Sequence, residues 1–323
     1  MPGAKYDMIA IDLDGTLLCP RGEVSAANLG AIRDARKAGI TVTVCTGRGL
    51  LECRHVTTII GQTDPVVVAG GSILACPVRQ RTLHRFAMEP ALVRGLVGHM
   101  TAHGHAALVL KDPTATAPGA TGADSANESC GGTAAHPAGH DYVVVSPTGW
   151  KGVDPVTRWW FDTLKVPVKL VASLDEDQHL DHTVRVGVCG TRAATEPVAR
   201  EVLAAFDGRV NSHHFGAVVP EGVIAGDGVT GGDQHIVIFE LFDKQASKWN
   251  AIMWLAAQRG LRPERICAIG NDVNDLDMLA NAGLGVAMGN AIPEARAAAR
   301  LHTHGNDADG VAHAIQQVLD GKW

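Results

Sequence analysis

The feature that most constrains this chain is a short apolar segment near its amino terminus that ends in two aspartates. Residues 8 to 11 are uncharged and predict a strand buried on both faces, as in the middle of a parallel sheet. Asp12 and Asp14 follow, and Gly15 lets the backbone turn sharply past them. Side chains alternate along an extended chain, so both carboxylates start on the same side. Because open α/β sheets bind ligands at the carboxyl ends of their strands, this segment predicts a ligand site.

Two carboxylates that converge in this way predict a bound cation. Like charges repel unless a cation or a shared proton intervenes, and the pair suits Mg2+ with one carboxylate left as a nucleophile. A polar turn is an alternative, because Asp and Gly are common turn residues. A calcium loop of the EF-hand type is another, and it requires Gly at its sixth position and Glu at its twelfth. Counted from Asp12, Gly15 is fourth and Glu23 is twelfth, so only half of that pattern is met.

Length and composition predict a two-domain globular protein. The chain has 323 residues, of which 46% are hydrophobic and 19% charged. The net charge of -6 without a basic run argues against a nucleic-acid partner. No apolar stretch approaches a membrane span, and the first aspartates come too early for a signal peptide. Scattered cysteines without a CxxC pair favour free thiols in a reducing compartment. We expect a soluble cytoplasmic enzyme whose oligomeric state the sequence leaves open.

Strands alternate with helices at both ends of the chain, which predicts a parallel, doubly wound sheet. The strands expected after the first are residues 40–45, 65–69, 264–272 and 283–290, and the expected helices are 25–38, 52–60, 249–259 and 276–282.

The middle of the chain has the spacing of a separate α+β unit. Expected strands lie near 106–110, 141–145, 184–189 and 235–240, and expected helices near 154–162 and 195–206. Residues 113–139 have almost no large apolar side chain and predict a mobile, dispensable loop, and 221–232 predict a second, glycine-rich one. We therefore expect a core of residues 1–79 and 241–323, interrupted by a domain of residues 80–240.

Two further segments carry groups that can bind a phosphate. Thr46, Gly47 and Arg48 follow the second expected strand, where a hydroxyl and backbone amides can hold a phosphoryl oxygen. Ser247 is a candidate helix cap, and Lys248 in the first turn is disfavoured by the helix dipole unless an anion lies nearby. The alternatives are an ordinary turn for the first segment and a solvated surface lysine for the second.

A fourth segment places several polar side chains between an expected strand and an expected apolar helix. Its members are Asn271, Asp272, Asn274, Asp275 and Asp277. Helix capping needs one such residue rather than five. Carboxylates with neighbouring amides suit oxygen ligation of Mg2+, so this segment predicts part of a metal site.

Taken in order, the four segments resemble the four motifs of the haloacid dehalogenase superfamily of phosphohydrolases. The resemblance is closest to its Cof-type members, in which a C2-type cap is inserted between the second and third motifs. It covers roughly residues 6–76 and 246–316, including the tail GLGVAMGNAIPEARAAA. It implies a Rossmann-like core with an inserted α+β cap. It also implies Mg2+-dependent hydrolysis of a small phosphate monoester, such as a sugar phosphate.

The resemblance implies a role for each matching residue. Asp12 would take the phosphoryl group as an aspartyl-phosphate, and Asp14 would protonate the leaving alcohol and then activate water. Thr46 would bind phosphoryl oxygens, and Lys248 would offset negative charge. Further phosphate-binding candidates are Gly47, Arg48 and Asn274, and the metal-binding candidates are Asp12, Asp14, Asn271, Asp272 and Asp275.

The chain departs from the family pattern at two places. The fourth motif usually reads Gly-Asp-x-x-Asn-Asp, so Asn271 puts a neutral amide where the usual metal ligand is a carboxylate. We expect Asp272 to turn inward and restore the charge, with Asp275 holding the loop. The alternative is that Asn271 itself ligates and Asp272 is a plain turn residue. After the third strand, residues 70–72 read Gly-Gly-Ser instead of the frequent Asn-Gly-Ala, so a side chain near the substrate is missing.

Two other functions stay open at this point: a phosphomutase of the same superfamily, and a catalytically weak metabolite-binding member. The spacing of His99, His103 and His105 is helix-like, but no acidic or Cys neighbour in the sequence supports zinc. His213 and His214 in the expected cap are candidates for substrate selection, with simple packing as the alternative.

Overall fold

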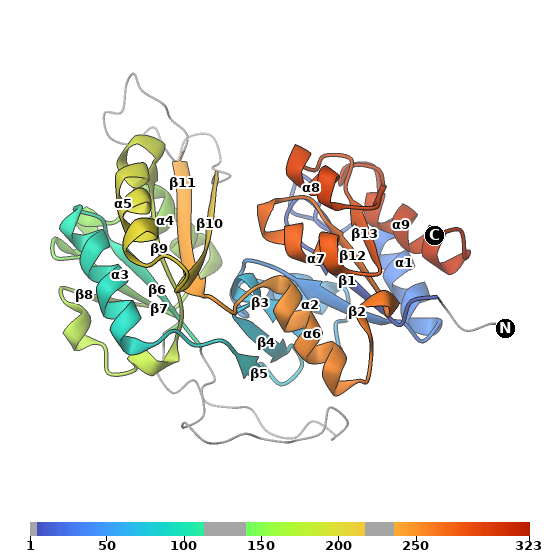
Figure 1. Ribbon diagram of the computed structural model, residues 1–323, viewed down its shortest axis with the longest axis horizontal. Coiled ribbons are helices and arrows are strands. Elements are labelled where there is room, and N and C mark those ends of the chain that lie inside the picture. Colours follow the sequence, from blue (N-terminus) through green and yellow to red (C-terminus); the bar gives the residue numbers. More distant parts are fainter. Residues whose placement is uncertain (1–4, 113–139, 217–235) are drawn as a thin grey trace. The chain divides into compact units, whose positions relative to one another are not determined.

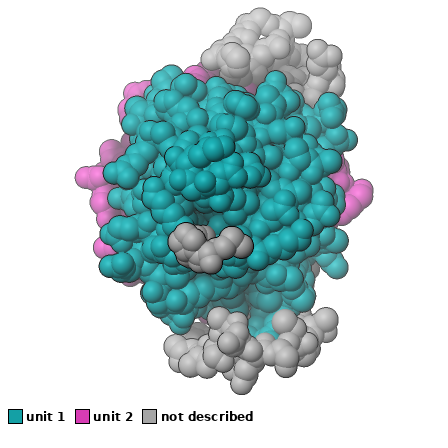
Figure 2. Space-filling view, turned by 90° about the vertical axis from the view of Figure 1, so that its right-hand side faces the viewer, with its two compact units in different colours: residues 1–84, 121–134, 247–323 teal, residues 85–120, 135–246 magenta. Residues whose placement is uncertain are grey.

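The computed structural model describes residues 5–112, 140–216 and 236–323 (Figure 1). The two loops predicted at 113–139 and 221–232 lie outside these described residues. The described residues form two compact units, one up to His84 and from Ser247 to Trp323, the other from Arg85 to Ala246 (Figure 2). The first unit thus combines the two ends of the chain, and the second is formed by its middle.

The first unit is built on an 8-stranded sheet with the order β14-β13-β12-β1-β2-β3-β4-β5. Its strands are β1 (Met8–Asp12), β2 (Thr41–Cys45), β3 (Val66–Val68), β4 (Ile73–Cys76), β5 (Arg81–Arg85), β12 (Ile266–Gly270), β13 (Leu284–Ala287) and β14 (Leu301–His302). All neighbours from β14 to β3 are parallel, and β4 pairs antiparallel with β3. Every residue of β1 is buried, which confirms the strand predicted to be covered on both faces.

Helices cover this sheet, with α1 beside α9 and α6 beside α7 (Figure 1). They are α1 (Ala26–Lys37), α2 (Arg54–Ile59), α6 (Lys248–Gln258), α7 (Leu276–Asn281), α8 (Pro293–Ala298) and α9 (Gly310–Leu319). The caps follow the sequence: the Ser25 side chain accepts a hydrogen bond from the backbone of Asn28, and Ser247 does the same for Asn250. The predicted α/β class with a mainly parallel, doubly wound sheet is confirmed.

The second unit is built on a 6-stranded sheet with the order β10-β11-β9-β6-β7-β8, in which only β7 and β8 are parallel. Its strands are β6 (Ala107–Lys111), β7 (Tyr142–Val145), β8 (Val168–Val171), β9 (Thr183–Thr191), β10 (Val210–Gly216) and β11 (Ile236–Asp243). Its helices are α3 (Pro90–Ala102), α4 (Pro155–Leu164) and α5 (Arg192–Ala205). Apolar side chains of α3 and α5 pack with one face of the sheet, as Leu96, Val202 and Val186 show. In neither unit is a described helix long and apolar enough to cross a membrane.

Candidate functional site

A buried lysine in the first unit joins two carboxylates that lie far apart in the sequence. Lys248 Nζ donates to Asp12 Oδ1 and to Asp275 Oδ1, each at 2.7 Å, and to Asn274 Oδ1 at 3.1 Å. Lys248 is 1% exposed, Asp12 4% and Asp275 0%. The second motif lies close by, since a Cβ on Gly47 would come within 3.8 Å of Asn274 Nδ2. The fold therefore brings the predicted motifs together where β1 ends and α6 begins, and Lys248 is not a surface lysine.

The charges of this cluster are strongly coupled. Burial, followed by the neighbouring charge of Asp275, raises the pKa of Asp12 to about 8, although Lys248 acts in the opposite direction. Burial disfavours the charge on Lys248, but Asp12 and Asp275 outweigh it and raise the pKa of Lys248 above its usual range. One ammonium group thus faces two carboxylates, and all three side chains are almost fully buried. When both carboxylates are ionised the cluster is negative, which favours an additional cation.

The side chain of Asn271 closes the other side of Asp12. One of its terminal amide atoms lies 3.2 Å from Asp12 Oδ2, 3.0 Å from the main-chain oxygen of Asp14 and 2.8 Å from Thr16 Oγ1. A nitrogen in this position donates hydrogen bonds to these oxygens. An oxygen accepts from the Thr16 hydroxyl and requires a cation between itself and the oxygens of Asp12 and Asp14. Neighbouring oxygens around an octahedral Mg2+ with metal–oxygen distances of about 2.1 Å lie about 3.0 Å apart. Asp12, the Asp14 carbonyl and Asn271 are therefore a donor set that fits this ion.

Asp272 and Asp275 organise the loop that carries Asn271. Asp272 Oδ1 accepts from the backbone nitrogen of Val273 at 2.7 Å and caps the short helix Val273–Asp275. Asp275 Oδ2 accepts from the backbone nitrogens of Asn271 and Asp272 at 2.8 and 3.1 Å. These contacts argue against Asp272 as the inward-turning metal ligand, because its carboxylate is held at the helix start. Both oxygens of Asp275 accept hydrogen bonds, one from Lys248 and the other from the backbone of the loop.

Asp14 and Arg48 form a bidentate ion pair. Arg48 Nε lies 2.9 Å from Asp14 Oδ2, and Arg48 Nη2 lies 2.6 Å from Asp14 Oδ1. Thr46, fully buried after β2, accepts the backbone N–H of Arg48 on its hydroxyl at 3.1 Å. The Asp14 carboxylate is 56% exposed, so it can reach a substrate from solvent. The candidate acid–base residue and a candidate phosphate ligand are thus paired with each other, which the sequence did not predict.

Two further contacts at the site escaped the sequence reasoning. Gly15 has φ +74°, and a Cβ there would lie 2.5 Å from Asn271 Nδ2, so only glycine allows this close approach. Asn290 Nδ2 donates to the Gly15 carbonyl at 2.8 Å and ties the tail of the chain to the first motif. The tail sequence that contains Asn290 was part of the family resemblance, so a signal for this residue was present.

The histidine candidates of the second unit pack against phenylalanines. The His213 ring lies 4.9 Å from that of Phe242, and the His214 ring lies 5.6 Å from that of Phe239, measured between centroids. These contacts favour the packing alternative for both histidines.

Comparison with known proteins decides the family. The sequence pattern of the haloacid dehalogenase-like hydrolases matches residues 9–130 and 225–315, more than half of the chain. The chain belongs to this family. It is similar to two Bacillus subtilis proteins, phosphatase YwpJ (26% identical, 97% of this chain and 99% of the relative) and 5-amino-6-(5-phospho-D-ribitylamino)uracil phosphatase YwtE (28%, 98% and 99%).

A solved haloacid dehalogenase-like hydrolase from Bacteroides thetaiotaomicron has the same fold, with a TM-score of 0.71 at 21% identity, covering 97% of this chain and 100% of that one. The predicted resemblance to Cof-type phosphohydrolases of the haloacid dehalogenase superfamily is confirmed, and with it the expectation of an enzyme.

A glycine next to the start of α6 offers a first test of this site. Gly71 has φ +100°, and a Cβ there would lie 2.1 Å from the carbonyl carbon of Ser247 and 2.4 Å from the nitrogen of Lys248. We expect Gly71→Ala to lower the free energy of unfolding by about 2 to 4 kcal/mol and to lower activity by shifting Lys248. Urea unfolding and turnover measure both effects. Gly61→Ala is the matched control, because Gly61 has φ +57° but open space around it. Equal losses of stability and activity in the two variants would show that the close contact between Gly71 and α6 is unimportant.

Proposed function

We propose that this family member is a Mg2+-dependent phosphatase that hydrolyses a small phosphate monoester, a sugar phosphate or related metabolite, through an aspartyl-phosphate on Asp12. The observation that carries the proposal is the buried cluster of Asp12, Lys248 and Asp275 beside the Asn271 amide. Lys248 lies on one side of the Asp12 carboxylate, and oxygen donors that can hold a cation lie on the other. These two positive charges would neutralise a phosphoryl group that Asp12 attacks.

In the proposed first step, a carboxylate oxygen of Asp12 forms a bond to phosphorus and the bond from phosphorus to the substrate alcohol breaks. Asp14 gives its proton to the departing alcohol oxygen. In the second step Asp14 takes a proton from water, the water oxygen attacks phosphorus, and the bond to Asp12 breaks to release phosphate. Lys248 and the backbone around Thr46 bind phosphoryl oxygens in both steps. Arg48, which pairs with Asp14 here, exchanges between that carboxylate and the substrate phosphate.

The metal proposal rests on the donor set of Asp12, the Asp14 carbonyl and Asn271, which fits the oxygen preference of Mg2+. When bound, Mg2+ supplies positive charge that stabilises the transferring phosphoryl group. Asp275 contributes by holding Asn271 and Lys248 in place.

The substrate class is proposed from chemistry and from relatives. YwtE acts, by its name, on a phosphorylated ribitylamino-uracil, which is a monoester of a polyol. We further propose that the second unit is the inserted cap that selects the substrate, and that the reaction takes place in the cytoplasm, since the described cysteines are free.

A panel of phosphorylated metabolites, assayed with and without Mg2+, tests this function. We expect free phosphate to be released stoichiometrically with the alcohol, only with Mg2+, and not by Asp12→Asn. Retention of phosphate in an isomeric product with dependence on a bisphosphate would replace the phosphatase by a mutase. The absence of any turnover over a broad panel would leave a metabolite-binding protein.

The identity of the metal ligand is tested with two neighbouring substitutions. Asn271→Asp adds a negative charge to the donor set, so we expect the half-saturating Mg2+ concentration to fall on the order of tenfold. Asp272→Asn is the matched control, because the Asp272 carboxylate caps a helix and an asparagine can do the same. Activity titrated with Mg2+ measures both. A rise in the half-saturating concentration for Asp272→Asn would return that residue to the metal site.

A further inference from the structure

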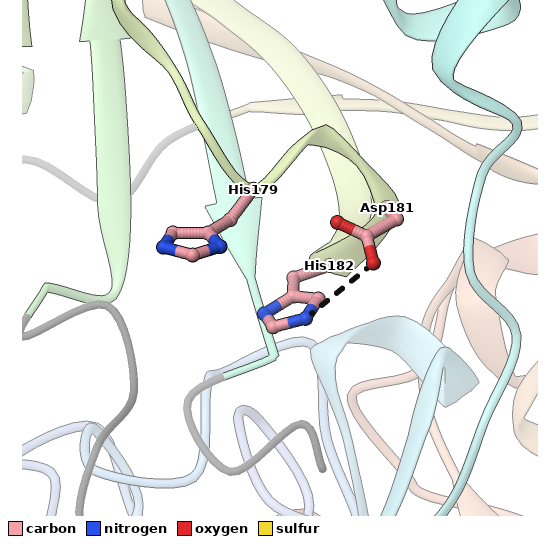
Figure 3. Close-up of side chains that lie close together, drawn as sticks. All are labelled: His179, Asp181 and His182. Atoms are coloured by element: carbon pink, nitrogen blue, oxygen red, sulfur yellow. Dashed lines mark ion pairs between the residues drawn. The ribbon is translucent and has the colours of Figure 1, made fainter. Parts of the chain in front are cut away.

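A cluster of side chains that can ligate a metal lies in the second unit, in a part of the sequence outside the four motifs of the family. His179, Asp181 and His182 lie around the short helix Leu180–His182, which leads directly into β9 (Figure 3). One ligand atom from each side chain lies within 4.8 Å of one from each of the others. Among the described residues, this is the only group of three such side chains that converges so closely. Two imidazoles and a carboxylate are ligands typical of zinc sites.

The distance between two of these groups matches ligation rather than hydrogen bonding. His182 Nε2 lies 3.6 Å from Asp181 Oδ2, which is too long for a hydrogen bond. Two ligands of a tetrahedral Zn2+ at about 2.0 to 2.1 Å from the ion lie about 3.3 Å apart. The rings of His179 and His182 are nearly parallel, with centroids 5.2 Å apart. Because the side chains of His179 and Asp181 are both partly exposed, rotation of these two side chains can close the group around the buried His182.

The buried histidine has a polar atom that no protein group satisfies. His182 is only 7% exposed, and its Nδ1 has no hydrogen-bond partner among the described residues. The other ring nitrogen, Nε2, faces Asp181 at a distance longer than a hydrogen bond and is therefore the atom available to an ion. The other histidine cluster of this unit behaves differently. Glu201, on α5, accepts from His99 Nδ1 at 2.6 Å and from His103 Nε2 at 2.7 Å, so those nitrogens are already paired.

The backbone that carries the cluster is fixed to β6 and the residue after it. The carbonyl of His182 accepts from the backbone nitrogen of Asp112 at 2.8 Å, and the carbonyl of His179 accepts from Lys111 Nζ at 3.2 Å. Lys111 is fully buried and also pairs with Asp177. These contacts hold both ends of the loop before any ion binds, which lowers the entropic cost of ordering the ligands.

We propose that His179, Asp181 and His182 bind one Zn2+ or a similar divalent transition-metal ion, as a site separate from the one at Asp12. Three protein ligands leave the fourth position of a tetrahedral ion to water. Imidazole ligands select transition metals over Mg2+, which prefers oxygen donors, so the two sites have different metal preferences.

The site is tested by titrating metal-free protein with Zn2+ in the presence of a large excess of Mg2+, with a chromophoric chelator as competitor. We expect one equivalent to bind to the wild type, and affinity to fall at least about tenfold in His179→Gln and in Asp181→Asn. Co2+ titration gives a second readout, since its visible spectrum reports tetrahedral coordination by the wild type and loss of it in both variants. The Asp181 side chain is 46% exposed, so Asp181→Asn keeps the test available should His179→Gln fold poorly.

Two controls separate this site from others. His99→Gln removes a histidine of the cluster that is paired with Glu201, and Asp12→Asn removes a carboxylate of the first unit; both should bind Zn2+ like the wild type. Absence of a bound equivalent in the wild type would overturn the proposal. So would unchanged affinity in both site variants, or a loss that appears only in His99→Gln or Asp12→Asn. Because the readout is binding, failure of the phosphatase proposal would leave this result unaffected.

Discussion

Asp12→Asn is expected to lower turnover by at least about a thousandfold, because an amide cannot form the covalent phosphoryl intermediate. The variant should fold normally. Asparagine has the shape of aspartate, and the substitution removes a carboxylate whose pKa burial raises to about 8. Lys248 keeps Asp275 as a charged partner at 2.7 Å.

Phosphate release and urea unfolding measure these two effects. Asp277→Asn is the matched control, since Asp277 is exposed in the first turn of α7, directly after the fourth motif. The control should retain full activity. Substantial turnover by Asp12→Asn, at the level of Asp277→Asn, would contradict the role of Asp12.

Lys248→Met is expected to lower the free energy of unfolding by about 3 to 5 kcal/mol, in addition to removing most activity. The substitution leaves two buried carboxylates, Asp12 and Asp275, facing each other without the ammonium group that now bridges them. Urea unfolding measures the loss, and Lys244→Met is the control because that lysine is exposed. The double variant Lys248→Met with Asp275→Asn should recover part of the stability. A loss no larger than that of Lys244→Met would mean that the cluster contributes little to stability.

The same cluster predicts the sign of a pH effect. A carboxylate whose pKa is raised on folding contributes stability that is fully present below its unfolded pKa and is lost as the pH rises to the folded value. For Asp12 this window runs from 3.8 to about 8. Without Lys248 the ionised form of Asp12 is even less favourable. The difference in the free energy of unfolding between the wild type and Lys248→Met should therefore grow as the pH rises through this window.

Strands and helices with a clear local sequence pattern could be predicted. The buried strand before Asp12 has no polar residue, and the helix from Ala26 to Lys37 has a serine cap before it and Gly39 with φ +83° after it. Elements with mixed exposure were missed. In β5 every residue is half-buried, and β10 is rich in polar residues, so neither shows a clear alternation. The helix α3 was also missed, although Leu92, Val93, Leu96 and Val97 are spaced for one helix face.

The candidate site was predictable as a set of motifs but not in its contacts. Polar side chains gathered at the ends of expected strands identified Asp12 and the fourth motif as parts of the site. The sequence could not show whether Asn271 or Asp272 faces Asp12. A shift of one residue along the loop exchanges the side chain that points inward with the one that points outward. Glu201 could not be foreseen as the partner of His99 and His103, since it comes from another helix about a hundred residues later. Such pairings depend on tertiary packing.

Rapid acid quenching during turnover, followed by peptide mass spectrometry, tests the central claim most directly. With a small phosphate monoester that the enzyme hydrolyses in the presence of Mg2+, we expect one phosphoryl group on the peptide that contains Asp12, and none on that peptide in Asp12→Asn. The label should appear and decay at rates compatible with turnover. A wild-type enzyme that releases phosphate without any label on Asp12, or that carries the label on another residue, would contradict the account.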